Sequence, residues 1–153
     1  MRRFLSILFG DDSALAAEAD GFAADQMAAA VLMVETARLD GAVQDAERDR
    51  IQSLLARRFG LTPWVAARLA ARAERTATES VAWQGLTHTL KEALGEAERI
   101  EILEMLWEVA YADGALHDYE TSLLRRVAGL LYVSDRDNGE ARLRVMAKLG
   151  IAR

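Results

Sequence analysis

The sequence predicts an all-α protein, a single-domain helical bundle of about seven helices with an internal pseudo-twofold duplication. The composition is rich in Ala, Leu, Glu and Arg with one proline, which favours helix throughout. Hydrophobic residues make up 52% of the 153 residues, which is enough for one core. The pattern Asp-Gly-Ala-[Val/Leu]-x-Asp-x-Glu occurs at residues 40–47 and again at 113–120. We therefore expect two three-helix repeats, at about 22–77 and 96–149.

Residues 1–21 are predicted to lie outside this bundle, as an amphipathic segment over 1–10 followed by a linker. Two arginines precede an apolar run that is too short to span a bilayer. Asp11 and Asp12 then interrupt what should be a neutral approach to a signal-peptidase site. We expect no secretory signal, and at most a peripheral membrane contact through residues 1–10.

The first helix is predicted over residues 22–39, where apolar side chains recur at helical spacing and form one buried stripe. The stripe consists of Met27, Val31 and Val34 with Ala30 and Ala37. Gly41 follows the last turn and is expected to end the helix in the left-handed conformation.

Two further helices are predicted to complete the first half. One begins near Gln44 and stops at Gly60. The other begins at Thr62-Pro63, where a hydroxyl cap precedes a proline at the first helical position, and runs to about residue 77.

A joining helix over 81–94, centred on Leu86 and Leu90, is predicted to lead into the second half. The next helix, 96–112, is expected to bury one face and to turn three glutamates to solvent. The inward residues are Ile100, Leu103, Leu106, Trp107 and Ala110, and the outward ones are Glu101, Glu104 and Glu108. Gly114 is expected to end this helix as Gly41 ends the first, and helices over 118–131 and from the Ser134 N-cap to about 149 follow.

Composition and spacing argue against several classes of function. The chain has no cysteine, which excludes disulfides, thiolate zinc sites and a cysteine nucleophile. The two imidazoles, His88 and His117, form no serine, acid and histidine set that spacing reveals, so we expect no enzyme. A net charge of −5 argues against general nucleic-acid binding.

Charge alternates along the chain, acidic over 1–47 and 92–120 and basic over 48–75 and 121–153. This alternation predicts a polarised surface. Arginines of the first basic segment are candidates for a surface that binds an anion or an acidic partner, although solvated helix faces explain them equally well. They are Arg57, Arg58, Arg68, Arg72 and Arg75.

The repeated pattern resembles the second half of a calcium-binding EF-hand loop, but the first half of such a loop is missing. The first and third ligand positions fall on Thr36 and Arg38 in one copy and on Val109 and Tyr111 in the other, so the required carboxylates are absent.

Two interpretations of the motif acids stay open. They could converge into an all-oxygen site for a divalent cation, formed by Asp40, Glu47, Asp113 and Glu120 with Glu35 and Glu108 behind them. Alternatively, the aspartates accept amide hydrogen bonds at the turns and the glutamates are favoured by a helix dipole.

The two motifs, together with the phrases at 106–114 and 126–134, make the chain resemble TerB-type tellurite resistance proteins over about residues 22–149. The resemblance implies an all-helical fold with internal pseudo-twofold symmetry, a role in resistance to tellurite or another chemical stress, and no known reaction. Related domains accompany stress-response systems and a membrane-anchored DnaJ-type co-chaperone. The acidic residues that are suspected of binding metal in the family correspond here to Asp40, Glu47, Asp113 and Glu120. Gln44 and His117 stand at cap positions where the family commonly has Ser, Thr or Asp.

From these observations and the resemblance, we expect a non-enzymatic helical interaction module of bacterial stress response, with protein partners. The alternative is a divalent-metal-binding protein or a metal-dependent enzyme that uses the acidic loops. We expect a cytoplasmic location, with membrane association through residues 1–10 left open.

Overall fold

The computed structural model describes residues 21–77, 83–112 and 118–151, and within these ranges every regular element is a helix. The all-α prediction is therefore confirmed. The elements in chain order are α3 (Ala24–Ala37), the 3-10 helix η1 (Arg38–Asp40), α4 (Asp45–Phe59), α5 (Pro63–Ala77), α6 (Trp83–Ala93), α7 (Glu96–Ala110), α8 (Asp118–Leu130) and α9 (Asp135–Leu149).

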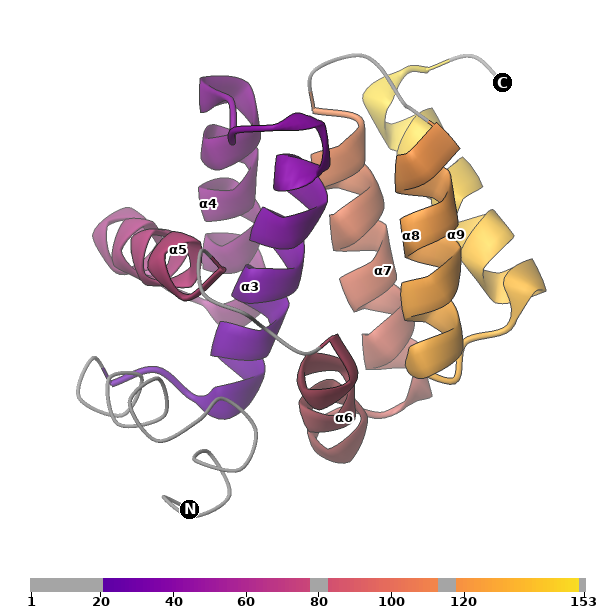
Figure 1. The fold of residues 1–153 in the computed structure, drawn as a ribbon, viewed down its shortest axis with the longest axis horizontal. Coiled ribbons are helices and arrows are strands. Elements are labelled where there is room, and N and C mark those ends of the chain that lie inside the picture. Colours follow the sequence, from indigo (N-terminus) through magenta and orange to yellow (C-terminus); the bar gives the residue numbers. More distant parts are fainter. Residues whose placement is uncertain (1–20, 78–82, 113–117, 152–153) are drawn as a thin grey trace.

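Helix α3 lies in the middle of the bundle and packs against α4, α5, α6 and α7 (Figure 1). The predicted stripe is buried, but burial extends all around the helix. Every residue from Met27 to Val34 is buried, Ala28 and Leu32 included, although they lie off the predicted stripe. A helix that is hydrophobic on all sides occupies the core, so α3 is the central element of the fold.

Helix α7 is the second central element, in contact with α3 and α4 on the one hand and with α8 and α9 on the other. Trp107 is almost fully buried, and its indole N–H donates a 2.9 Å hydrogen bond to Oδ1 of Asn138 in α9. The prediction that Glu108 faces solvent is wrong, since this residue is only 3% exposed. The physical reason is that other helices cover more than one face of α7. The prediction assumed that α7 has a single buried face.

The helix ends largely follow the local sequence signals. The Thr62 hydroxyl accepts the N–H of Val65 at 3.3 Å, and the Ser134 hydroxyl accepts the N–H of Asp137 at 3.1 Å. Gly60 adopts the left-handed conformation after α4. Gly41 has a positive φ of 128°, but its ψ of −115° lies outside the left-handed region. Gly114 lies outside the described residues.

The two triplets of helices have matching bounds. Adding 73 to the bounds of α3, α4 and α5 gives 97–110, 118–132 and 136–150, each within two residues of the bounds of α7, α8 and α9. Matching bounds do not establish that the triplets superpose, so the internal duplication stays a prediction.

No described helix combines the length and the apolar character that crossing a membrane requires. The predicted amphipathic segment and linker over 1–20 lie outside the part of the chain that the structure describes.

Candidate functional site

The most unusual side chain of the described structure is the buried carboxylate of Glu108 on α7. Its Oε1 atom lies 3.1 Å from Nζ of Lys148 and 3.6 Å from Nη1 of Arg50. Its Oε2 atom accepts a 3.3 Å hydrogen bond from Nη2 of Arg57. A buried charge is tolerated when it is paired, and here three cations surround one carboxylate. Positive charge is therefore in excess around Glu108.

Helical spacing explains how these groups meet. Arg50 and Arg57 are seven residues apart and so lie on one face of α4. Arg144 and Lys148 are four apart on the last turns of α9, and Glu104 and Glu108 are four apart on α7. The acidic face of α7 thus lies between a basic face of α4 and a basic face of α9.

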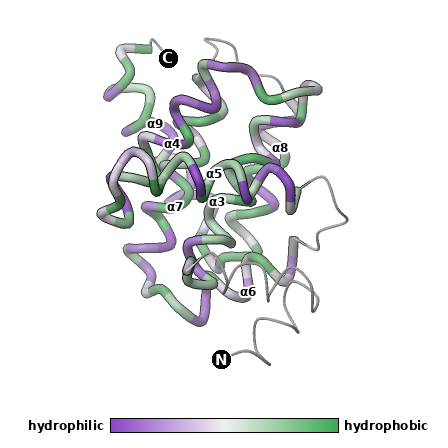
Figure 2. Tube along the Cα trace, turned by 90° about the vertical axis from the view of Figure 1, so that its left-hand side faces the viewer, coloured by the Kyte–Doolittle hydropathy of each residue, from purple (hydrophilic) through white to green (hydrophobic). Residues whose placement is uncertain are grey.

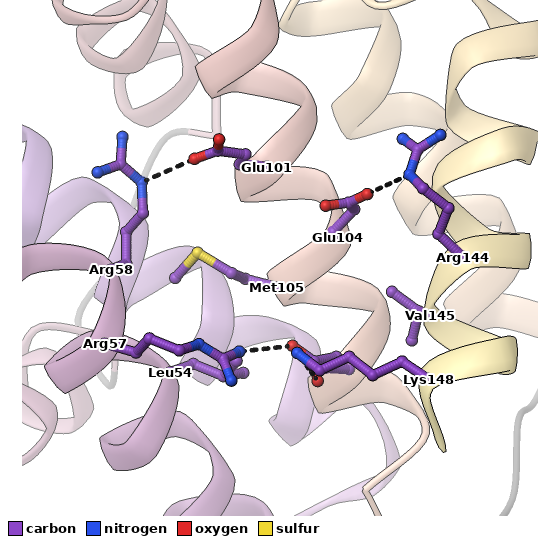
Figure 3. Close-up of a pocket in the computed structure, with 10 residues that line it drawn as sticks. Leu54, Arg57, Arg58, Glu101, Glu104, Met105, Arg144, Val145 and Lys148 are labelled. Atoms are coloured by element: carbon purple, nitrogen blue, oxygen red, sulfur yellow. Dashed lines mark hydrogen bonds and ion pairs between the residues drawn. The ribbon is translucent and has the colours of Figure 1, made fainter. Parts of the chain in front are cut away.

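A cavity of about 480 Å³ opens along this face of α7 (Figure 3). One wall is formed by α4 with Arg57 and Arg58, and the other by α9 with Arg144 and Lys148. Between the walls lie Met105 and the α7 glutamates Glu101 and Glu104. Glu108 of α7 also lines the cavity. We call this cavity and its lining the charged groove.

The remaining glutamates near the groove are also paired with wall cations. Arg58 lies 3.3 Å from Glu98 and 3.5 Å from Glu101, and Arg144 hydrogen-bonds to Glu104. The wall side chains nevertheless reach solvent, since about half of the side-chain surface of Arg144 and of Lys148 is exposed. Arg144 and Lys148 therefore reach solvent above the buried Glu108, while Glu101 at the other end of the groove is also exposed.

The five arginines named from the sequence are divided between two surfaces. Arg57 and Arg58 line the charged groove, whereas Arg68, Arg72 and Arg75 belong to α5. Three of the basic residues near Glu108 were not predicted from the sequence: Arg50, Arg144 and Lys148. The spacing of Arg50 and Arg57 by seven residues, and of Arg144 and Lys148 by four, could have shown that each pair lies on one face of its helix. No local feature of the sequence indicates that these two helices, α4 and α9, lie on either side of α7.

The motif acids are only partly described. Glu47, in the first turn of α4, is 2% exposed, and its Oε1 atom accepts the backbone N–H of Gln44 at 2.8 Å. This hydrogen bond caps the start of α4, whereas the sequence had suggested for Glu47 only a favourable interaction with the helix dipole. Glu120 on α8 is also buried, at 5% exposure. The side chain of Asp40 and the whole of Asp113 lie outside the described residues.

The residues that the structure describes contain no group of three or more His, Asp and Glu that could hold a metal ion. The divalent-cation site therefore stays a prediction that depends on Asp40 and Asp113. Glu108, predicted from the sequence as a supporting residue of that site, lines the charged groove.

Glu35, the other supporting residue, lies 3.5 Å from Arg38. Burial raises the pKa of the Glu35 carboxyl, and the neighbouring Arg38 guanidinium offsets part of that rise. Arg38 also donates a 2.6 Å hydrogen bond to the carbonyl oxygen of Ala77, so it ties the end of α3 to the end of α5. A structural role for this pair is evident from these contacts.

The helices gathered around α3 and α7 define an all-α bundle domain. The chain belongs to the TerB family, because the family model of the tellurite resistance protein TerB matches residues 26–143, most of the chain. The matched range begins in α3 and ends in α9. The resemblance seen in the sequence is confirmed. Comparisons with curated proteins and with solved structures found no match.

Proposed function

We propose that this chain is a non-enzymatic interaction module of bacterial stress response, of the tellurite-resistance type, and that its charged groove binds an acidic segment of a protein partner. The observation that carries the proposal is that three basic side chains, Arg50, Arg57 and Lys148, contact one buried carboxylate, that of Glu108. These three positive charges outnumber the single negative charge between them, so an acidic ligand can pair with the remaining positive charge.

The exposure of the groove side chains supports an acidic partner. Arg57, Arg144 and Lys148 expose 59%, 52% and 50% of their side chains, whereas Glu108 exposes 4%. A partner that approaches the part of the groove around Glu108 therefore meets Arg57 and Lys148 before it meets that carboxylate, whereas Glu101 lies exposed elsewhere in the groove. Arginine forks can bind a carboxylate through two parallel hydrogen bonds, which favours glutamate and aspartate side chains as ligands.

The chemistry of the lining supports recognition rather than catalysis. The described lining residues are arginines, a lysine, glutamates and aliphatic side chains. Their charged groups are already engaged in ion pairs, which suits a surface that exchanges one set of ion pairs for another on binding. Met105 between the walls adds an adaptable apolar contact.

The test uses a fluorescently labelled glutamate-rich peptide and measures its anisotropy as the full chain is added. We expect binding that weakens as salt is raised, because the contacts are electrostatic and partly exposed. The double variant Arg57→Gln/Lys148→Gln should weaken the affinity about tenfold or more. A second double variant, Arg58→Gln/Arg144→Gln, should weaken it in the same direction and does not alter the partners of Glu108.

The matched control is Arg126→Gln/Arg136→Gln, which removes two positive charges from exposed positions on α8 and α9. It should leave the affinity within about twofold of that of the unaltered chain, since these charges are not in the groove. Failure of the peptide to bind at low salt would overturn the proposal. Equal weakening by the control and the groove variants would do so too, because binding would then follow net charge alone.

A further inference from the structure

The outward face of α5 carries an exposed tryptophan at the head of a basic stripe. Trp64 is 69% exposed, which makes it the most exposed tryptophan among the described side chains. Arg68, Ala71 and Arg75 follow at spacings of four, three and four residues, and all three are exposed. These positions therefore lie on one side of the helix. Figure 2 looks onto the side of the molecule on which α5 lies.

The opposite side of α5 fixes the helix firmly to the bundle. Ala66, Leu69, Ala70 and Ala73 are buried, and α5 packs against α3 and α4. The outward stripe is thus presented by a helix whose orientation the core determines.

Arg68 holds Trp64 in place. Its guanidinium carbon lies 5.0 Å from the centre of the Trp64 ring and 5.8 Å from the centre of the Phe22 ring. Phe22 is itself 6% exposed and belongs to the core. The guanidinium therefore lies within cation–π distance of both a buried ring and an exposed ring, and the second contact favours the outward position of Trp64.

Negative charge is almost absent from α5. Its single acidic residue, Glu74, binds Arg48 of α4 through both carboxylate oxygens, each at 3.0 Å. The stripe itself consists of an aromatic residue, two arginines and an alanine. Its charge is therefore complementary to an anionic surface, although the whole chain carries a net charge of −5.

We propose that this face of α5 docks on an anionic lipid surface, with the Trp64 ring at the level of the headgroups and with Arg68 and Arg75 against lipid phosphates. Tryptophan favours the membrane–water interface because its ring is apolar and its N–H is polar. Basic side chains near an anionic leaflet add electrostatic attraction. A fluid lipid surface also accommodates a convex helix without a shaped counterpart.

The described part of the chain begins beside this face of α5. Residue 21 immediately precedes Phe22, whose ring contacts Arg68. The proposal concerns α5 and is independent of the charged groove.

The test measures co-sedimentation of the full chain with vesicles of equal parts phosphatidylglycerol and phosphatidylcholine, and with vesicles of phosphatidylcholine alone. We expect partition to the anionic vesicles only. Arg68→Gln/Arg75→Gln and Trp64→Ala should each lower the partition coefficient about tenfold or more. The control Arg126→Gln/Arg136→Gln removes the same charge from α8 and α9 and should leave partition unchanged.

A fluorescence measurement distinguishes docking through α5 from other membrane contacts. Anionic vesicles should shift the tryptophan emission of the unaltered chain to shorter wavelength, and the shift should be absent in Trp64→Phe. The variant Phe4→Ser/Phe9→Ser tests residues 1–10 in the full chain. Loss of partition in this variant, with full partition in the α5 variants, would overturn the proposal. So would equal partition to both kinds of vesicle, or none to either.

Discussion

The Glu108 carboxylate of α7 and the Lys148 ammonium of α9 lie 3.1 Å apart, although 40 residues separate them in the chain. The same carboxylate contacts Arg57 of α4 at 3.3 Å. The side chain of Glu108 therefore links α7 to α4 on one side and to α9 on the other. This arrangement makes Glu108 a contributor to stability as well as to the charge of the groove.

Replacement of Glu108 by glutamine should destabilise the fold by about 1–3 kcal/mol, because three cations lose a shared partner while the amide can still accept a hydrogen bond. The estimate lies below the usual cost of breaking a buried pair, since Arg57 and Lys148 expose about half of their side chains and are hydrated. Urea denaturation measures the effect.

The matched control for this measurement is Glu104→Gln on the same face of α7. Glu104 is paired with one arginine, Arg144, and is more exposed than Glu108, so its loss should cost less than about 1 kcal/mol. Equal costs for the two variants would contradict a special role of Glu108.

Glu35 should make stability fall as the pH rises through the acidic range. Burial raises the pKa of Glu35 in the folded protein, so the folded state binds the proton more tightly than the unfolded state does. The stability that this proton adds is present below the unfolded-state pKa and is lost as the pH rises through the higher folded-state pKa.

The variant Glu35→Gln removes this titration, so its stability relative to the unaltered chain should increase as the pH is raised from the acid side to neutrality. Urea denaturation at a series of pH values gives the difference directly. The opposite trend would show that the attraction of Arg38 outweighs the burial of Glu35.

Gly41→Ala should destabilise the protein by about 1–3 kcal/mol, because the backbone angles of Gly41 fall in a region that is unfavourable for any residue with a β-carbon. The melting temperature should fall by several degrees, since about 1 kcal/mol corresponds to about 2–4 °C in a domain of this size. The cost comes from the backbone alone, because a β-carbon at this position would meet no atom within 4 Å.

A helical glycine provides the control. Gly139 lies inside α9, is exposed, and would place a β-carbon in open space. Gly139→Ala should therefore stabilise the protein by about 0.5–1 kcal/mol. If Gly41→Ala left the stability unchanged or raised it as Gly139→Ala does, the conformation assigned to Gly41 would be wrong.

Tyr132→Gly should stabilise the protein by about 0.5–1 kcal/mol. Tyr132 follows α8 with a positive φ of 59°, a conformation that costs a non-glycine residue about 1 kcal/mol or more. Part of the gain is offset, because the Lys91 ammonium lies 3.9 Å from the centre of the tyrosine ring and this contact would be lost.

Thermal unfolding measures the effect of the substitution, with Lys91→Ala as the reference for the ring contact alone. A clear destabilisation in Tyr132→Gly would show that the ring contact outweighs the backbone strain.

Helix starts and stops were predictable because their signals are local. Thr62-Pro63, Ser134 and Gly60 each mark a helix end through a hydrogen bond or a backbone angle that involves only nearby residues. Tyr132 departs from this pattern. The comparable position after α4 is a glycine, and no glycine follows α8, so the left-handed residue there carried no local signal.

The site was less predictable, because it depends on contacts between distant parts of the chain. Periodicity assigns one buried face to α7, and on that basis Glu108 was expected in solvent. Its burial arises because α4 and α9 approach α7, and the partner Arg57 is 51 residues away. The division of the predicted arginine surface could not be predicted for the same reason. The turn at Gly60 places Arg58 on α4 and Arg68 on α5, and these helices present their arginines on different surfaces.

The all-round burial of α3 means that the chain has no dividing line at which one part could melt while the rest stays intact. Loss of α6 and α7 would expose one side of α3 to water, and loss of α4 and α5 would expose another. Heat or denaturant should therefore unfold residues 21–151 in one cooperative transition, with the same midpoint for near-ultraviolet and far-ultraviolet signals. The amides in the middle of α3 should exchange with solvent only through that global event, and so should be the slowest of the protein to exchange.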